Sequence, residues 1–279
     1  MYLPGRGETF IREFGPRDAP ALVLLHGWTV TADLNWFTSY DALAEHHRVI
    51  TIDHRGHGRG IRSRRPFRLA DCADDAVAVA DALGIDTFVP VGYSMGGPIA
   101  LEMWRRHRHR VSGLVLCATF AHVTVTPRSR TRMRALGLAG RSLKAVPQSV
   151  SRAGFERLLD QQTAGRDLGR WVHDQIRSCD PRHLLQAGGE IGRFDARSWI
   201  DQVDVPTAVL VMERDTVVPP ARQLELAEAL PMARRWSLEA DHDVCVMRRH
   251  EFLPSFLEAC THSAHEAAPT GDSSLYSPP

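Results

Sequence analysis

The stretch DTFVPVGYSMGGPIALEMWRR, residues 86–106, decides the fold. It opens with a short apolar run that is typical of a buried strand, and a helical pattern follows over residues 98–108. Between them stands Gly92-Tyr93-Ser94-Met95-Gly96, a G-x-S-x-G motif. On a strand-to-helix transition this motif predicts a sharp turn that exposes a serine hydroxyl, and glycine leaves room where such a turn brings the chain close to itself. Ser94 is therefore the candidate nucleophile.

Other short apolar runs predict further strands. They cover residues 21–25, 49–52, 88–91, 111–117 and 208–212. Runs such as ALVLL do not alternate with polar residues, which is typical of parallel strands covered on both faces by helices. The sequence therefore predicts an α/β fold with a doubly wound, mostly parallel sheet, in which ligands bind beyond the carboxyl ends of the strands.

The strand-helix rhythm stops in the second half of the chain, where segments 152–162, 166–179 and 181–194 have helical patterns. We expect residues 121–203 to form a helical cap, inserted after the sixth strand, that lies over the strand ends as a lid. The α/β core would then comprise residues 1–120 and 204–260. Residues 261–279 are poor in large apolar side chains, and we expect a disordered tail there.

Composition excludes several classes of partner. The formal net charge is +1, which gives no reason to expect nucleic acid. The five cysteines are odd in number and lack C-x-x-C spacing, which argues against a disulfide framework. The sequence starts without a signal-peptide pattern, and no apolar run reaches the roughly 18 residues of a membrane span. We expect a cytoplasmic protein without stable membrane insertion; its oligomeric state stays open.

Three further stretches carry a resemblance to a known family: LLHGW at 24–28, DHRGHG at 53–58 and VPTAVLVMERDTVVPP at 205–220. With the G-x-S-x-G motif, they make the sequence similar to the α/β-hydrolase superfamily, in its serine esterase, lactonase and perhydrolase branch, over about residues 9–259. The resemblance implies the α/β-hydrolase fold and an enzyme that needs no cofactor.

The resemblance also implies a catalytic triad. In this fold the acid and the histidine follow the serine in that order. Asp215 stands after the 208–212 run, where the family carries its acid, and His242 follows the last strand-like segment. The two backbone N–H groups implied for the oxyanion hole are those of Met95 and Trp28. Trp28, Trp36 and Phe120 are candidate substrate-binding residues for an acyl pocket.

The expected reaction is hydrolysis of a carboxylic ester of a small molecule through an acyl-enzyme intermediate. A lactonase, a C–C bond hydrolase and a cofactor-free perhydrolase stay open as alternatives, because all of them use the same triad. A non-catalytic ligand-binding relative is a further alternative, which a fluorophosphonate label would exclude by reacting with an activated serine.

Two other patterns draw attention. His54 and His57 have no third ligand nearby in the sequence, so we expect surface residues and no metal site. Residues 104–141 hold nine arginines and no acidic residue. Arg128, Arg130, Arg132 and Arg134 are either a solvated face or a group that attracts an anionic substrate.

Overall fold

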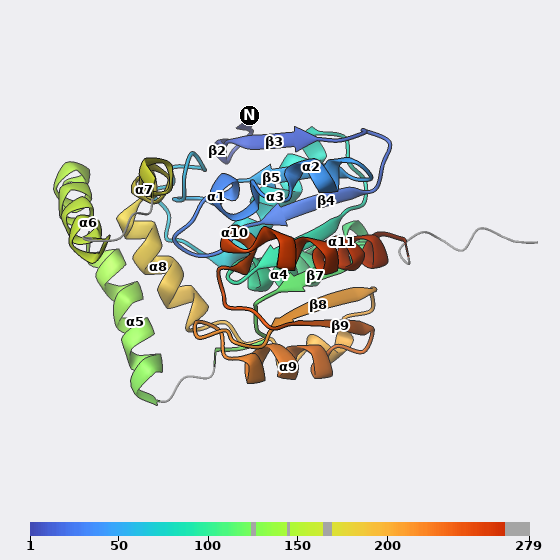
Figure 1. The fold of residues 1–279 in the computed structure, drawn as a ribbon. Helices are drawn as coiled ribbons and strands as arrows, with labels where there is room; N and C mark the ends of the chain where they lie inside the picture. The colour runs from blue at the N-terminus through green and yellow to red at the C-terminus, as the bar shows by residue number, and fades with distance from the viewer. Residues whose placement is uncertain (124–126, 144–145, 164–168, 266–279) are drawn as a thin grey trace, which may run out of the picture.

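The computed structural model describes residues 1–123, 127–143, 146–163 and 169–265 (Figure 1). In this part of the chain, seven strands form one sheet in the order β3-β5-β4-β6-β7-β8-β9. All neighbouring strands are parallel except β3, which runs antiparallel to β5. The strands are β3 (Ile11–Phe14), β4 (Ala21–Leu25), β5 (Arg48–Ile52), β6 (Val89–Tyr93), β7 (Leu114–Cys117), β8 (Thr207–Met212) and β9 (Ala233–Leu238). A separate antiparallel pair consists of β1 (Tyr2–Leu3) and β2 (Gly7–Glu8).

The central strands are buried because helices cover both faces of the sheet. Every residue of β4, β5, β6, β7 and β8 is buried, as their uninterrupted apolar runs predict. One face packs against the helices α3 (Leu69–Ala82), α4 (Gly96–Arg106) and α9 (Pro220–Ala229). The other packs against α1 (Ala32–Trp36), α2 (Tyr40–Ala44), α10 (Val244–Met247) and α11 (Arg249–His265). The expected doubly wound α/β architecture is confirmed.

The segment between β7 and β8 is mainly helical in its described parts. It contains α5 (Pro127–Ser142), α6 (Gln148–Thr163), α7 (Gly169–Arg177) and α8 (Pro181–Ile191). These helices stand at one end of the sheet, with α5 and α8 side by side (Figure 1). The strand count differs from the expectation, because β7 is the fifth strand of the main sheet along the chain rather than the sixth.

The tail begins later than expected. α11 continues to His265, and Ser263 Oγ in its last turn donates to the carbonyl of Leu114 at 2.8 Å. The prediction of disorder from residue 261 is therefore wrong up to residue 265, since this turn is buried against β7. Residues 266–279 lie outside the described residues. No helix in the described part of the chain combines the length and apolar character that a bilayer span requires.

Candidate active site

Ser94 lies on the turn between β6 and α4. Its φ of 52° is in the left-handed region, which non-glycine residues seldom adopt. The turn is held by Ser94 N–H, which donates to the carbonyl of Cys117 at 2.9 Å, and by Thr119 Oγ1, which donates to the carbonyl of Ser94 at 2.7 Å. A Cβ on Gly92 would lie 2.3 Å from the carbonyl oxygen of Gly96. The glycine of the motif is thus required by a close approach of the backbone.

A cavity of about 200 Å³ opens beside this turn. Ser94 and three residues singled out from the sequence, Met95, Trp28 and Phe120, line it. The remaining lining residues are mostly apolar and come from both the core and the helical insertion: His122, Val123, Met133, Ile191, Val217, Val218, Pro219 and Arg222. The serine hydroxyl therefore faces a small apolar space, as ligand sites commonly do.

Asp215 and His242 form a hydrogen-bonded pair. Nδ1 of His242 lies 2.7 Å from Oδ2 of Asp215, whose side chain is fully buried. The other carboxylate oxygen, Oδ1, accepts the backbone N–H groups of Val217 at 2.7 Å and Val218 at 2.8 Å. Gln223 Nε2 donates to Oδ2 at 3.0 Å. A carboxylate that accepts this many bonds is fixed in place, and it orients the imidazole with Nε2 left for other contacts.

His242 lies next to the nucleophile turn. The hydroxyl of Tyr93, the residue directly before Ser94, donates to the carbonyl of His242 at 2.7 Å. The Tyr93 ring meets the His242 ring edge to face, with centroids 5.7 Å apart. Burial raises the pKa of the Tyr93 hydroxyl well above its ordinary value, so it stays a donor. The hydroxyl of Tyr93 thus joins the loop that carries His242 to β6.

Trp28 and Met95, the residues expected to supply the N–H groups of an oxyanion hole, both line the cavity with Ser94. In the described residues, the structure gives no acceptor for the N–H of Trp28 or of Met95. Met95 directly precedes α4, where the helix dipole favours an anion. The loop of Trp28 is held by Gly27 N–H, which donates to Asn35 Oδ1 at 2.9 Å.

His26 braces the same loop. Its Nε2 accepts the N–H of His54 at 2.9 Å, so the ring proton sits on Nδ1, 2.7 Å from the carbonyl of Gly27. Burial lowers the pKa of His26, which keeps the ring neutral in this role.

Trp36 does not line the cavity. It is fully buried in the core, where it stacks on Phe256 with ring centroids 5.4 Å apart and meets Tyr93 edge to face. The prediction that Trp36 contacts substrate is wrong, because α1 turns this side chain into the sheet-facing core instead of toward the strand ends.

His54 and His57 are buried, so their prediction as surface residues is also wrong. Both rings contact His26, with centroid distances of 4.2 Å and 5.2 Å. Burial lowers the pKa of both rings well below the usual value, and His26 lowers each further. Among the described residues, no group of three or more histidine, cysteine or acidic side chains is arranged to hold a metal ion.

Two site residues were missed by sequence reasoning. Gln223 is fully buried, donates to Asp215, and accepts the N–H of Met212 at 2.9 Å. Arg222 reaches the cavity, where Nη1 lies 3.4 Å from Nε2 of His122. Both residues are in the first turn of α9, whose sequence is polar. A position in a helix does not by itself reveal which side chain points into the core. The proximity to Asp215 along the sequence is the one signal that could have suggested Gln223.

Known proteins share this arrangement of strands and helices. A solved enol-lactonase from Burkholderia xenovorans LB400 superposes with a TM-score of 0.75 at 25% identity, over 94% of this chain and 99% of its own. An esterase from Thermogutta terrifontis superposes with a TM-score of 0.75 at 22% identity, over 94% and 96%. A pimeloyl-[acyl-carrier protein] methyl ester esterase from Chromobacterium violaceum is 30% identical over 264 residues, 89% of this chain and 96% of that protein. Residues 20–245 match the family model described as the alpha/beta hydrolase fold, so this chain belongs to the alpha/beta hydrolase family and is a hydrolytic enzyme.

Proposed function

We propose that the protein is a serine hydrolase that cleaves a carboxylic ester through an acyl-enzyme intermediate, with Ser94, His242 and Asp215 as its triad. One observation carries this proposal. Ser94 is held in a left-handed turn at an apolar cavity, and the half-buried His242, hydrogen-bonded to the buried Asp215, contacts Tyr93, the residue before Ser94.

In the proposed reaction, Nε2 of His242 takes the proton of the Ser94 hydroxyl as Oγ attacks the ester carbonyl. The N–H groups of Met95 and Trp28 donate to the oxygen that becomes negative, an interaction worth several kcal/mol in a water-poor site. His242 then gives the proton to the leaving alcohol. Water, deprotonated by His242, releases the acid and restores Ser94. No cofactor takes part.

Trp28 and Phe120 would hold the acyl group, and the cap, residues 121–203, would close the site as a lid. Support for the lid comes from Met133 of α5 and Ile191 of α8, which line the cavity together with the core residues. The cavity of about 200 Å³ favours a small or slender acyl group. The name of the Chromobacterium violaceum relative, a methyl ester esterase, supports an ester substrate.

Lactone hydrolysis is the second candidate. It is supported by the similarity to the Burkholderia xenovorans enol-lactonase, which extends over 94% of this chain. A lactone is a cyclic ester, so the same triad would open it, and the hydroxyl would stay on the acyl product.

We further propose that the protein works in the cytoplasm on a small molecule. The five cysteines are all free and buried thiols, a state that a reducing compartment maintains.

The test is an activity-based label combined with a substrate panel. Wild type should react rapidly with a fluorophosphonate and should hydrolyse p-nitrophenyl esters of graded chain length; lactones are assayed beside them. Ser94→Ala should lose both reactions, and Ser112→Ala, which changes a serine outside the cavity, should keep both. Retention of a tenth of the esterase activity in Ser94→Ala would refute the assignment.

A further inference from the structure

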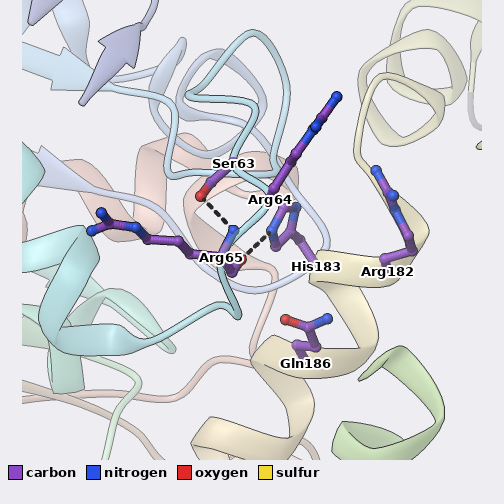
Figure 2. A pocket seen from close by; sticks show the side chains of 6 residues that line it. All are labelled: Ser63, Arg64, Arg65, Arg182, His183 and Gln186. Carbon is purple, nitrogen blue, oxygen red and sulfur yellow. Dashed lines mark hydrogen bonds between the residues drawn. The ribbon is translucent and has the colours of Figure 1, made fainter. Parts of the chain in front are cut away.

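A second cavity lies where the loop before α3 meets the start of α8, and it shares no lining residue with the cavity at Ser94 (Figure 2). It has a volume of about 310 Å³. Six residues line it: Ser63, Arg64, Arg65, Arg182, His183 and Gln186. A volume of this size is within the range of small-molecule sites.

The cavity is basic. Three of its lining residues are arginines and none is acidic. Residues 59–68, the loop that forms one wall, contain five arginines and no Asp or Glu. Among them, Nη2 of Arg62 donates to two backbone carbonyls, those of Gly58 and Ser178, and within the described residues the structure gives Arg62 no ion pair.

The two arginines of the opposite walls differ in their partners. Arg182 Nε and Nη2 bond the two carboxylate oxygens of Asp180, at 3.2 Å and 2.8 Å. Arg64 is exposed, and among the described residues the structure gives its guanidinium no hydrogen bond or ion pair. In Figure 2 the side chain of Arg65 points away from those of Arg64 and Arg182. Arg64 therefore supplies an uncompensated positive charge.

The loop before α3 and the start of α8, which form the walls of the cavity, are joined by contacts that exist without a ligand. Asp180 N–H donates to the carbonyl of Gly56 at 2.7 Å. A Cβ on Gly56 would lie 2.2 Å from Cβ of His183, so the start of α8 packs directly on this loop. Gln186 Oε1 accepts the N–H of Phe67 at 2.7 Å, and its Nε2 donates to the carbonyl of Gly140 at 3.0 Å. A preformed site loses little freedom when it binds.

We propose that this cavity binds a phosphate group, either inorganic phosphate or a small phosphate monoester, between Arg64 of the core and Arg182 of the cap. Guanidinium groups bond phosphate oxygens through fixed, charge-assisted pairs, and a dianion suits a cavity with an uncompensated positive charge. Arg182 stays paired with Asp180 and presents Nη1, while Arg64 supplies the balancing charge. The bound phosphate would join the loop before α3 to α8.

Because the cavity lies at the start of α8, phosphate binding there would affect the active-site cavity at Ser94. One residue after His183, α8 contacts the loop that carries Trp28, because Trp28 Nε1 donates to the carbonyl of Leu184 at 2.9 Å. One side of α8 thus faces the phosphate and another holds Trp28. A phosphate that fixes the start of α8 also fixes one wall of the active-site cavity.

The experiment measures phosphate binding to the full chain by calorimetry at 25 °C and by the thermal unfolding temperature. Inorganic phosphate and glycerol 3-phosphate are titrated against sodium chloride of equal ionic strength. The proteins are wild type, Arg64→Gln and the control Arg235→Gln, which changes an exposed arginine on the edge strand β9. We expect saturable binding and a rise in unfolding temperature for wild type and Arg235→Gln.

Arg64→Gln should weaken binding about tenfold, since a hydrogen bond to a charged group contributes on the order of 1.4 kcal/mol or more. Tighter binding of the monoester than of phosphate would identify an organic phosphate as the ligand; equal binding would identify the free ion. The proposal is overturned by two results: no saturable binding by wild type, or equal binding by wild type and Arg64→Gln. Neither depends on esterase activity, so the proposed reaction is tested separately.

Discussion

Nδ1 of His242 and Oδ2 of Asp215 lie 2.7 Å apart, and that same oxygen receives the amide of Gln223 at 3.0 Å. The acid is thus bonded on every side: two backbone N–H groups hold its other oxygen. A carboxylate held by these bonds keeps one orientation, and it holds the imidazole of His242 through the bond to Nδ1. The loop after β8 fixes the imidazole before any substrate arrives.

Replacement of Asp215 by Asn tests this relationship. The amide keeps the size of the side chain, but its NH₂ group favours the wrong imidazole tautomer and does not stabilise imidazolium. We expect kcat for an ester to fall on the order of 10,000-fold with little change in fold. Asp201→Asn, an exposed position, should leave kcat unchanged. A loss below about threefold in Asp215→Asn would point to a different acid.

Gln223→Glu tests the role of the amide. The new carboxyl would lie 3.0 Å from that of Asp215, and two carboxylates this close do not both ionise readily, so the pKa of the pair rises. A carboxyl with a raised folded pKa binds more protons in the folded state, so the variant should lose stability as pH rises above about 4.3. Between pH 5 and 8 we expect its unfolding temperature and kcat/KM to fall progressively below those of wild type.

The matched control is Gln202→Glu, which places the same carboxyl on an exposed turn. Its unfolding temperature and its kcat/KM should match those of wild type at every pH. If Gln223→Glu also followed wild type between pH 5 and 8, the bond from Gln223 to Asp215 would have no part in positioning the acid.

The parts of the fold that could be predicted are those with an unbroken local signal. β4 and β8 were found because strands buried on both faces read as continuous apolar runs. β3 was missed, since its sequence Ile-Arg-Glu-Phe mixes charge with apolar residues on a partly exposed edge. α5 was not predicted as a helix because it carries few apolar residues and two glycines, Gly137 and Gly140, that let α8 approach.

The site shows the same limit. Asp215 and His242 could be named because the resemblance to the α/β hydrolases implies an acid and then a histidine, each after a strand, in that order along the chain. The burial of His54 and the inward direction of Trp36 could not be predicted, because both depend on how a loop or a short helix packs against the core. Sequence periodicity does not show which way a side chain points in a loop or in a helix of only five residues.

The buried histidines predict acid sensitivity. His54 has no hydrogen bond to either ring nitrogen within the described residues, and burial lowers the pKa of both His54 and His57 well below normal. Unfolded histidines take up protons below about pH 6.5, whereas these two stay neutral in the folded state. Stability should therefore be complete above that pH and fall as pH drops, by up to about 1.4 kcal/mol per group and pH unit.

Chemical unfolding of wild type, His54→Leu and His250→Gln between pH 8 and pH 5 checks this. His54→Leu removes one of the buried histidines with a lowered pKa, so its loss of stability per pH unit should be smaller than that of wild type. His250 is exposed, so His250→Gln should behave as wild type. Equal slopes in all three proteins would show that other groups cause the acid loss.

The arginines of α5 give the last prediction. The side chains of Arg128 and Arg130 lie outside the described residues, but Arg134 lines a cavity of about 360 Å³ that shares His122 and Val123 with the cavity at Ser94. Arg134 therefore lies in a cavity next to the one at Ser94, where a cation would attract an anionic ester.

The measurement compares kcat/KM for a neutral ester and a matched anionic half-ester at low and high salt. We expect added salt to slow the half-ester selectively, because exposed charges are screened over about 8 Å at physiological ionic strength. Arg134→Glu should lower the half-ester to neutral-ester ratio, and the control Arg141→Glu, an exposed position at the end of the same helix, should change it less. If the two substrates respond alike to salt and to Arg134→Glu, these arginines form only a solvated face and the substrate need not be anionic.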